Sequence, residues 1–131
     1  MNSREKGKRG ERELARYLRS HGFEDARRGV QYNGADGSAD VIGLPGWHVE
    51  VKRVEALNIE KALQQAERDA EGIAETPCVF HRRNGESWKV TIRARIFLAL
   101  IKEIQRLQKE IEILIQEIGR RRKNENPARG D

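Results

Sequence analysis

The chain has 131 residues, enough for one compact domain with a helical appendage but not for a second catalytic domain. Charged residues make up 36% of it, against about 25% in ordinary globular proteins, so a densely charged surface is expected. Residues 1–16 hold six Lys or Arg and three acids, and residues 119–131 hold five and two. These basic ends indicate an anionic polymer as partner, most commonly nucleic acid, or simply a surface that favours solubility.

Cysteine content and hydropathy favour a cytoplasmic location. Cys78 is the single cysteine, which excludes an internal disulfide. No apolar stretch approaches the length of a membrane span, and the sequence "MNSREKGKRG" lacks the apolar core of a signal peptide.

The first half of the chain is predicted to contain a helix and a strand joined to a polar loop. Apolar residues at helical spacing predict an amphipathic helix over 5–21, with Gly22 as its stop. A short strand over 26–30 follows, and then a loop over 31–40 rich in Gly, Asn, Asp and Ser. Such long polar loops often carry function, and the ring of Tyr32 could wedge against a base there.

The middle of the chain is predicted to form a β-hairpin, a helix and two further strands. An apolar run, a Leu-Pro-Gly turn at 44–46 and a strand over 47–53 form the hairpin. The later elements are a helix over 59–71 capped by Asn58 and strands over 78–83 and 87–92. This order predicts an α/β fold, a mixed sheet with helices packed on it.

The last part of the chain has a heptad pattern. Apolar residues alternate in steps of three and four at Phe97, Leu100, Ile104, Leu107, Ile111, Leu114 and Ile118. Isoleucine and leucine in these two positions are typical of parallel two-stranded coiled coils. Ile96, Ile101 and Ile115 widen the stripe, so a helix packed on its own domain stays an alternative. We therefore expect a core domain at 1–95 and a long amphipathic helix with a basic tail at 96–131.

A charged constellation is predicted on the hairpin. Glu50 and Lys52 lie two positions apart in a strand, so their side chains point to one face. A hairpin reflected about Pro45 sets Asp40 opposite Glu50, and directly opposed residues share a face. A two-residue turn would send Glu50 to the far face, so convergence needs an odd-length loop or a bulge. The alternative is a solvated face with a simple ion pair.

Such a constellation has a definite chemistry. Two carboxylates close together repel unless a cation neutralises them, and hard oxygen ligands suit Mg²⁺ or Mn²⁺. A bound metal could polarise a scissile phosphate and lower the pKa of a bound water. Lys52 would orient or deprotonate that water, or stabilise charge that develops on the phosphorane. The arrangement therefore favours hydrolysis of a phosphodiester.

These residues also carry a family resemblance. "SAD" at 38–40 followed by "VEVK" at 49–52 resembles the signature of the PD-(D/E)XK nucleases. "KGKRGERELARYLRSHGF" at 6–23 is similar to the first helix of the archaeal and phage Holliday junction resolvases in that superfamily. The similarity runs over residues 6–92 and implies a restriction-endonuclease-like fold that cleaves DNA with a divalent metal. Ala39 stands where the signature usually has proline, which removes a rigid residue but no metal ligand.

The resemblance implies a role for each site residue. In that family an acid from the first helix joins the acids and the lysine of two strands. On this chain the roles fall to Glu11 from the helix, Asp40 and Glu50 as direct metal ligands with the backbone carbonyl of Val51, Lys52 as catalytic lysine, and Gln65 on the following helix. Glu13 lies in the same helical turn region and is the alternative to Glu11.

Basic residues near the constellation are candidates for contacts with DNA phosphates. They are Lys6, Lys8 and Arg9 at the start of the chain, Arg27 and Arg28 beside the hairpin, and Arg82 and Arg83 at the end of a later strand. A frayed charged terminus and ordinary solvated faces are the alternatives. The three histidines lack zinc spacing, so no zinc site is expected.

These observations lead to one main hypothesis and two rivals. The main hypothesis is a Mg²⁺-dependent DNA endonuclease that resolves four-way junctions as a homodimer, because a symmetric junction needs paired cuts. The nearest rival is a nuclease of the same architecture with another DNA substrate, such as a nicking, flap or recombination-associated enzyme. The other rival is a non-catalytic, basic, dimeric DNA-binding protein.

Overall fold

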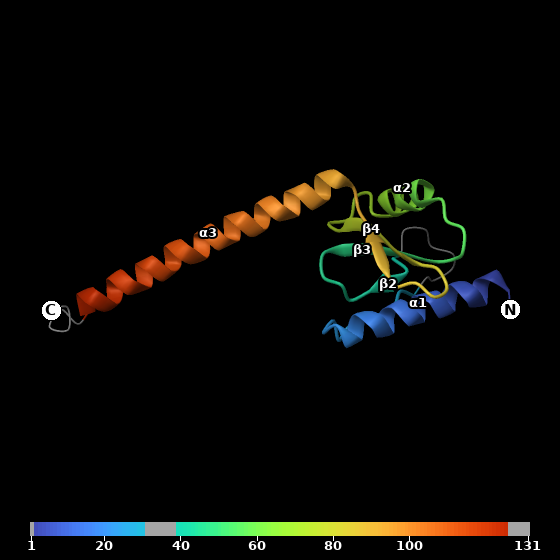
Figure 1. Ribbon diagram of the computed structural model, residues 1–131, viewed down its shortest axis with the longest axis horizontal. Coiled ribbons are helices and arrows are strands. Elements are labelled where there is room, and N and C mark those ends of the chain that lie inside the picture. Colours follow the sequence, from blue (N-terminus) through green and yellow to red (C-terminus); the bar gives the residue numbers. More distant parts are fainter. Residues whose placement is uncertain (1, 31–38, 126–131) are drawn as a thin grey trace. The chain divides into compact units, whose positions relative to one another are not determined.

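The computed structural model describes residues 2–30 and 39–125, and the chain divides into two compact units, Met1–Ile92 and Arg93–Asp131. The elements are α1 (Ser3–Ser20), β1 (Arg27–Arg28), β2 (Val41–Ile42), β3 (Trp47–Arg53), α2 (Ile59–Asp69), β4 (Thr76–Arg82), β5 (Lys89–Thr91) and α3 (Ala94–Glu125), shown in Figure 1. Their order is the predicted one. Tyr32 lies outside the described residues. None of the helices in the described ranges is long and apolar enough to cross a membrane.

The five strands form one mixed sheet in the order β1-β2-β3-β4-β5. β3 and β4 run parallel, and every other neighbouring pair is antiparallel. A parallel pair needs a crossover connection, which α2 supplies. The predicted fold class is confirmed: this is a mixed α/β sheet flanked by helices, as in restriction-endonuclease-like folds.

The two helices of the first unit cover opposite faces of the sheet (Figure 1). Leu14 and Leu18 of α1 pack with Val49 of β3 in one core cluster, while Leu63 of α2 packs with Val79 of β4 in another. Paired residues of neighbouring strands share a face, and Val79 is paired with Glu50. Glu50 therefore projects from the face of the sheet that α2 covers.

Capping residues set where the helices begin. The side chain of Asn2 accepts a hydrogen bond from the backbone N–H of Glu5, and that of Asn58 accepts one from Lys61. After α1, Gly22 adopts a φ of +95°, a conformation that favours glycine.

The strand boundaries differ from the prediction, and β5 is also shorter, with Lys89–Thr91 in place of 87–92. β1 covers only Arg27–Arg28 of the expected strand over 26–30, and β4 begins at Thr76 rather than at residue 78. The earlier start of β4 brings Pro77 into the strand, although proline lacks an N–H. β5 pairs with β4 only from Val79 to His81, so Pro77 lies beyond the part of β4 that needs donors on that side.

Candidate active site

The β2–β3 hairpin has the register that brings Asp40 next to Glu50. Val41 pairs with Val49, so the hairpin is centred on Pro45, and Asp40 comes directly before the paired residue of β2. The number of residues between the paired Val41 and Val49 is thus odd. This is the condition under which residues at equal distances from Pro45 point to the same face of the sheet. The charge of Asp40 acts on Glu50, in agreement with two carboxylates that lie close together. The backbone N–H of Asp40 also donates to the carbonyl oxygen of Val49 over 2.9 Å.

Main-chain groups hold Asp40 in place. Its Oδ2 accepts a hydrogen bond of 2.8 Å from the N–H of Val51, and its carbonyl oxygen accepts one of 2.9 Å from the N–H of Gly29. Glycine is required at position 29, because an added Cβ would lie 1.9 Å from the carbonyl oxygen of Ala39. The carboxylate is therefore oriented by the β1–β2–β3 backbone and does not depend on a flexible neighbour.

Glu50 is almost completely buried, with 4% of its surface exposed. Its Oε1 lies 3.6 Å from the Nζ of Lys52 on the same face of β3. About a third of the Lys52 side chain is exposed, so its ammonium group can also reach a ligand that approaches the acids. The predicted clustering of Asp40, Glu50 and Lys52 is thus present in the structure.

Both acids are difficult to ionise in this environment. Burial, followed by the charge of Asp40, raises the pKa of Glu50 to about 7, and Lys52 opposes the change. Burial likewise raises the pKa of Asp40, to about 6, although the hydrogen bond from Val51 favours the ionised form. A buried carboxylate pair of this kind is stabilised by a cation that neutralises it.

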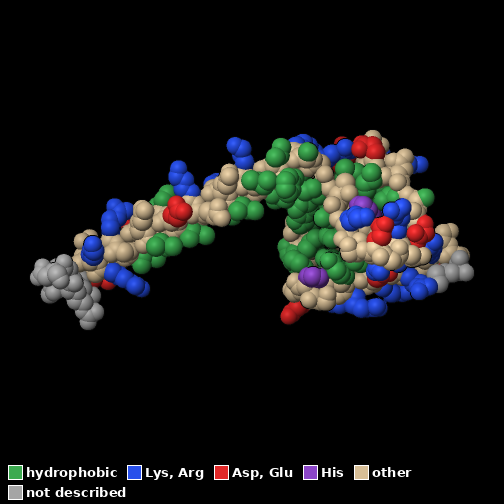
Figure 2. Space-filling view, viewed as in Figure 1, with side chains coloured by type: hydrophobic (Ala, Val, Ile, Leu, Met, Phe, Trp, Pro, Cys, Tyr) green, Lys and Arg blue, Asp and Glu red, His purple; other side chains and the backbone are tan. Residues whose placement is uncertain are grey.

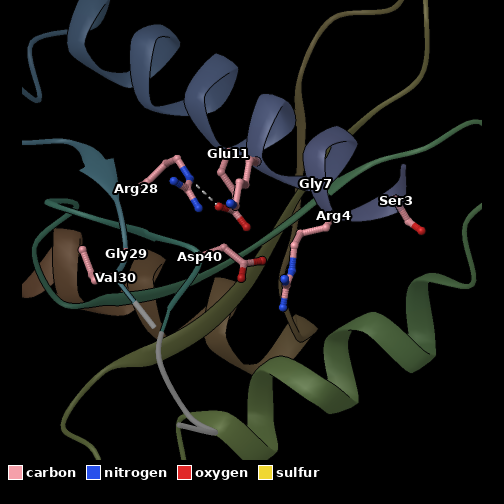
Figure 3. Close-up of a pocket in the computed structure, with 9 residues that line it drawn as sticks. Ser3, Arg4, Gly7, Glu11, Arg28, Gly29, Val30 and Asp40 are labelled. Carbon is pink, nitrogen blue, oxygen red and sulfur yellow. Dashed lines mark hydrogen bonds and ion pairs between the residues drawn. The ribbon is translucent and has the colours of Figure 1, made fainter. Parts of the chain in front are cut away.

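Glu11 approaches Asp40 from α1. The two side chains point into the same pocket, which has a volume of about 560 Å³ and is also lined by Arg4 and Lys8 (Figure 3). The Nε of Arg28 donates to Glu11 over 2.8 Å. The negative charge of Glu11 also contributes to the raised pKa of Asp40, so the two carboxylates influence each other electrostatically.

Glu13 has different partners from Glu11. Its Oε2 lies 3.2 Å from the Nε of Arg53 on β3, and its Oε1 accepts a hydrogen bond from Arg82 on β4. These contacts tie α1 to the centre of the sheet, outside the pocket that holds Asp40. Of the two candidate acids on α1, Glu11 is therefore the one that lies at the acidic pair.

The arrangement of oxygen donors fits a small, hard cation. Mg²⁺ is usually bound through one or two carboxylates and keeps several water molecules. Asp40 and Glu50 supply two carboxylates, and the carbonyl of Val51 faces the same strand edge as its N–H, which contacts Asp40. In the described ranges, no three or more His, Cys, Asp or Glu side chains form a group that could hold a metal. The site thus resembles a carboxylate pair in which Glu50 is buried and Asp40 faces a pocket, more than a closed protein cage.

Other polar side chains lie on the α2 side of the sheet. Gln65 is half-buried on α2, and Asp69, one helical turn further along, adds to the raised pKa of Glu50. His48 is fully buried two positions before Glu50, and its Nδ1 lies 3.6 Å from the carboxylate of Glu75. Asp69 was not predicted as a site residue. The spacing of four from Gln65 was the only sequence signal that pointed to it.

The predicted DNA-binding residues of the first half lie in three places. Lys8 and Arg28 line the pocket of Glu11 and Asp40, whereas Lys6 and Arg9 line a neighbouring depression. Arg27 is exposed and, as the neighbour of Arg28 in β1, points to the other face of the sheet. Figure 2 shows Lys and Arg side chains gathered along the edge of the core unit that α1 forms.

Arg82 and Arg83 lie away from this pocket. Besides its contact with Glu13, Arg82 donates from Nε to the carbonyl oxygen of Glu86 over 2.6 Å. Arg83 lies 2.8 Å from the carboxylate of Glu86 and is mostly exposed. Arg82 thus has a structural ion pair, and Arg83 belongs to the charged surface at the β4–β5 turn.

Comparison with known proteins agrees with this geometry. The family model described as "phage putative PDDEXK endonuclease" matches residues 2–126, which includes every residue of the site. No curated protein and no solved structure matches the chain. Enzymes of the PD-(D/E)XK superfamily are nucleases that generally use divalent metal ions, in agreement with the carboxylate pair and the lysine. The chain therefore belongs to the family of phage PDDEXK endonucleases.

Proposed function

We propose that this chain is a Mg²⁺-dependent endodeoxyribonuclease that cuts branched DNA, specifically a four-way Holliday junction, as a homodimer. The observation that supports the hydrolytic part is the clustering of Asp40, Glu50 and Lys52, in which Asp40 also lines a pocket rimmed by basic residues. Mn²⁺ prefers similar ligands and would replace Mg²⁺.

Asp40, Glu50 and the carbonyl of Val51 would hold the metal, which when bound polarises the scissile phosphate and lowers the pKa of a coordinated water. Glu11 would take part from α1, directly or through a water, and its pairing with Arg28 keeps it pointed at the pocket. Gln65 would act from α2 as a positioning residue. These side chains come from α1, from β3, from α2 and from the residue before β2, so the folded core is needed to assemble them.

Lys52 would act on the water and on the phosphate. Its ammonium group lies beside Glu50 on the partly exposed side of the site, within reach of a phosphodiester that approaches the acids. A cation there stabilises the negative charge that grows on the phosphate oxygens in the transition state. Lys8 and Arg28 at the pocket would position the DNA strand through its phosphates, with little reading of base sequence.

The preference for a branched substrate rests on symmetry and charge. A four-way junction presents two equivalent strands, and a dimer with two-fold symmetry would place one active site on each. Arg4, Lys8 and Arg28 line the pocket of Glu11 and Asp40, as expected for recognition of backbone shape. The similarity of the first helix to junction resolvases supports the same choice.

Cleavage by point variants tests the site. Asp40→Asn, Glu50→Gln and Lys52→Ala should each reduce cleavage by about 100-fold or more while DNA binding persists, because each removes a group used in the transition state. Lys61→Ala, which changes an exposed lysine on α2, is the matched control and should cut normally. Undiminished cleavage by Asp40→Asn would show that the site is assigned to the wrong residues.

Cleavage of different DNAs tests the substrate. A labelled four-way junction and a linear duplex of matching sequence would be incubated with Mg²⁺ or with EDTA. Paired symmetric nicks in the junction alone, and only with Mg²⁺, are expected. Equal cutting of both DNAs would favour a nuclease with another substrate, and tight binding without cuts under Mg²⁺ or Mn²⁺ would favour a non-catalytic dimeric binding protein.

A further inference from the structure

α3 carries a continuous strip of exposed apolar side chains. The strip, here called the seam, consists of Phe97, Leu100, Ile104, Leu107, Ile111, Leu114 and Ile118. Each of these residues is between 40% and 60% exposed, and none of the residues of α3 is buried. Figure 2 shows hydrophobic side chains following the length of the helix. Most of the stability of an amphipathic helix comes from packing its apolar face, so the seam requires a partner surface.

We propose that the seam binds the seam of a second copy of this chain in a parallel two-stranded coiled coil. The first position of each heptad is Phe or Ile and the second is always Leu. In a parallel pair each layer joins like residues, isoleucine with isoleucine and leucine with leucine, which is the composition that favours two parallel strands. An antiparallel pair would mix the two kinds of residue in every layer.

The residues beside the seam agree with this partner. One flank carries Glu103, Glu110 and Glu117 in successive heptads, and the other carries Arg122 one turn beyond the seam. In a parallel pair the flank position of Glu117 meets that of Arg122 on the other copy, which joins opposite charges. In an antiparallel pair the glutamate flanks would face each other.

Contacts within α3 also keep the seam clear of charge. Arg106 lies on the outer side of the glutamate flank, forms an ion pair with Glu103 and lies 2.8 Å from the carboxylate of Glu110. Both acids are thereby drawn away from the apolar strip. The row of flanking acids makes an anionic surface such as DNA or an acidic membrane an unsuitable occupant of this face.

The seam is long enough for a short coiled coil between two copies of the chain. From Phe97 to Ile118 it extends about 33 Å at 1.5 Å per residue, or roughly three heptads. Ile101 and Ile115 lie on the flank opposite the glutamates and widen the apolar surface that the pair would bury. Because the core unit precedes α3 in the chain, a parallel pair joins both cores to the same end of the coiled coil.

The inference rests on the homodimer of the proposed function, and sedimentation of the full chain tests it without reference to nuclease activity, so the seam can fail while the nuclease activity holds. Ile111→Asp places a charge in the seam, whereas Ile113→Asp makes the same change at a residue of similar exposure outside it (55% and 52% exposed). The wild type and Ile113→Asp should sediment as dimers. Ile111→Asp should dissociate about 100-fold more readily or more, because a buried charge is costly.

Disulfide trapping tests the orientation. The one native cysteine, Cys78, is buried, so a disulfide formed by a cysteine added to the seam would identify the residue that it faces. Leu114→Cys should form a disulfide-linked dimer by itself, because the same seam position meets across a parallel pair. A disulfide that Leu114→Cys formed only with Ile104→Cys or Phe97→Cys chains would overturn the parallel arrangement, because an antiparallel pair sets Leu against Phe or Ile. A monomeric wild type, or an Ile111→Asp protein that stays dimeric, would overturn the seam as the interface.

Discussion

Glu50 is buried beside a second acid, and this position conflicts with the stability of the fold. The side chain is 4% exposed, and burial together with the charge of Asp40 raises its pKa to about 7. A nuclease benefits from such a pair because a cation binds where the charge is concentrated. Without a cation, ionisation of the pair in the folded state has an energetic cost that the unfolded chain does not bear.

Glu50→Gln should therefore stabilise the metal-free protein at high pH while it abolishes cleavage. The pKa of Glu50 is raised on folding, so wild-type stability should fall as the pH rises from about 4.5 to about 7 and stay low above that. The variant lacks this loss, and its advantage at pH 8 should be about 1–3 kcal/mol. Thermal unfolding in EDTA between pH 4.5 and pH 8 measures it. Glu71→Gln, at an exposed glutamate, is the control, and an advantage that did not grow with pH would contradict the explanation.

Glu11 and Glu13 are predicted to have separable roles. Glu13→Gln should lower the free energy of unfolding by about 1–2 kcal/mol, because its carboxylate has charged hydrogen bonds with Arg53 and Arg82. Glu11→Gln should change stability less, since the lost pairing with Arg28 is offset by relief of repulsion with Asp40, but it should reduce cleavage. Urea unfolding and junction cleavage by both variants check this. The assignment would be wrong if Glu13→Gln were the variant with a stable fold and weak cleavage.

At the scale of elements, the close approach of α1 to β3 positions Glu11. Gly10 is buried at this contact, and an added Cβ would lie 2.7 Å from the Cβ of Arg53. Any larger residue would move the helix away from the strand. Because Glu11 is the next residue, such a shift would also move its carboxylate relative to Asp40.

Gly10→Ala should consequently destabilise the protein by about 1–3 kcal/mol through overpacking and should also weaken cleavage. Gly7→Ala is a matched control in the same helix, because an added Cβ there meets no atom within 4 Å. That change should stabilise the protein by up to about 1 kcal/mol, since alanine is the better helix former. Chemical denaturation compares the two variants, and equal stabilisation by both would show that the helix and strand are not in close contact at Gly10.

At the scale of the whole molecule, the proposed coiled coil and the proposed junction cleavage predict a coupled result. A dimer should cut both strands of one cruciform in a supercoiled plasmid before it dissociates, which gives linear DNA. Ile111→Asp protein should instead give mainly nicked circles, because each monomer cuts one strand. Ile113→Asp is the control and should give linear DNA. Gel analysis measures the ratio of linear DNA to nicked circles. If Ile111→Asp protein gave linear DNA at the wild-type rate, paired cutting would not depend on the seam.

The sequence alone was sufficient for features that depend on local spacing. The order of elements, the Asn58 cap and the α3 helix follow from periodicity and capping within short windows. The convergence of Asp40, Glu50 and Lys52 was also accessible, because the strand repeat and the hairpin reflection involve only neighbouring residues. The one open point was the parity of the loop, which the pairing of Val41 with Val49 decides.

Only the tertiary structure decided the features that depend on long-range packing. Glu11 and Glu13 lie two residues apart on one helix, and the packing of α1 against the sheet determines which of them meets Arg28 and which meets Arg53. The partnership of Arg82 with Glu13 and the influence of Asp69 on Glu50 likewise join residues that are distant along the chain. Spacing describes one element at a time, whereas these contacts arise only when two elements are fixed against each other.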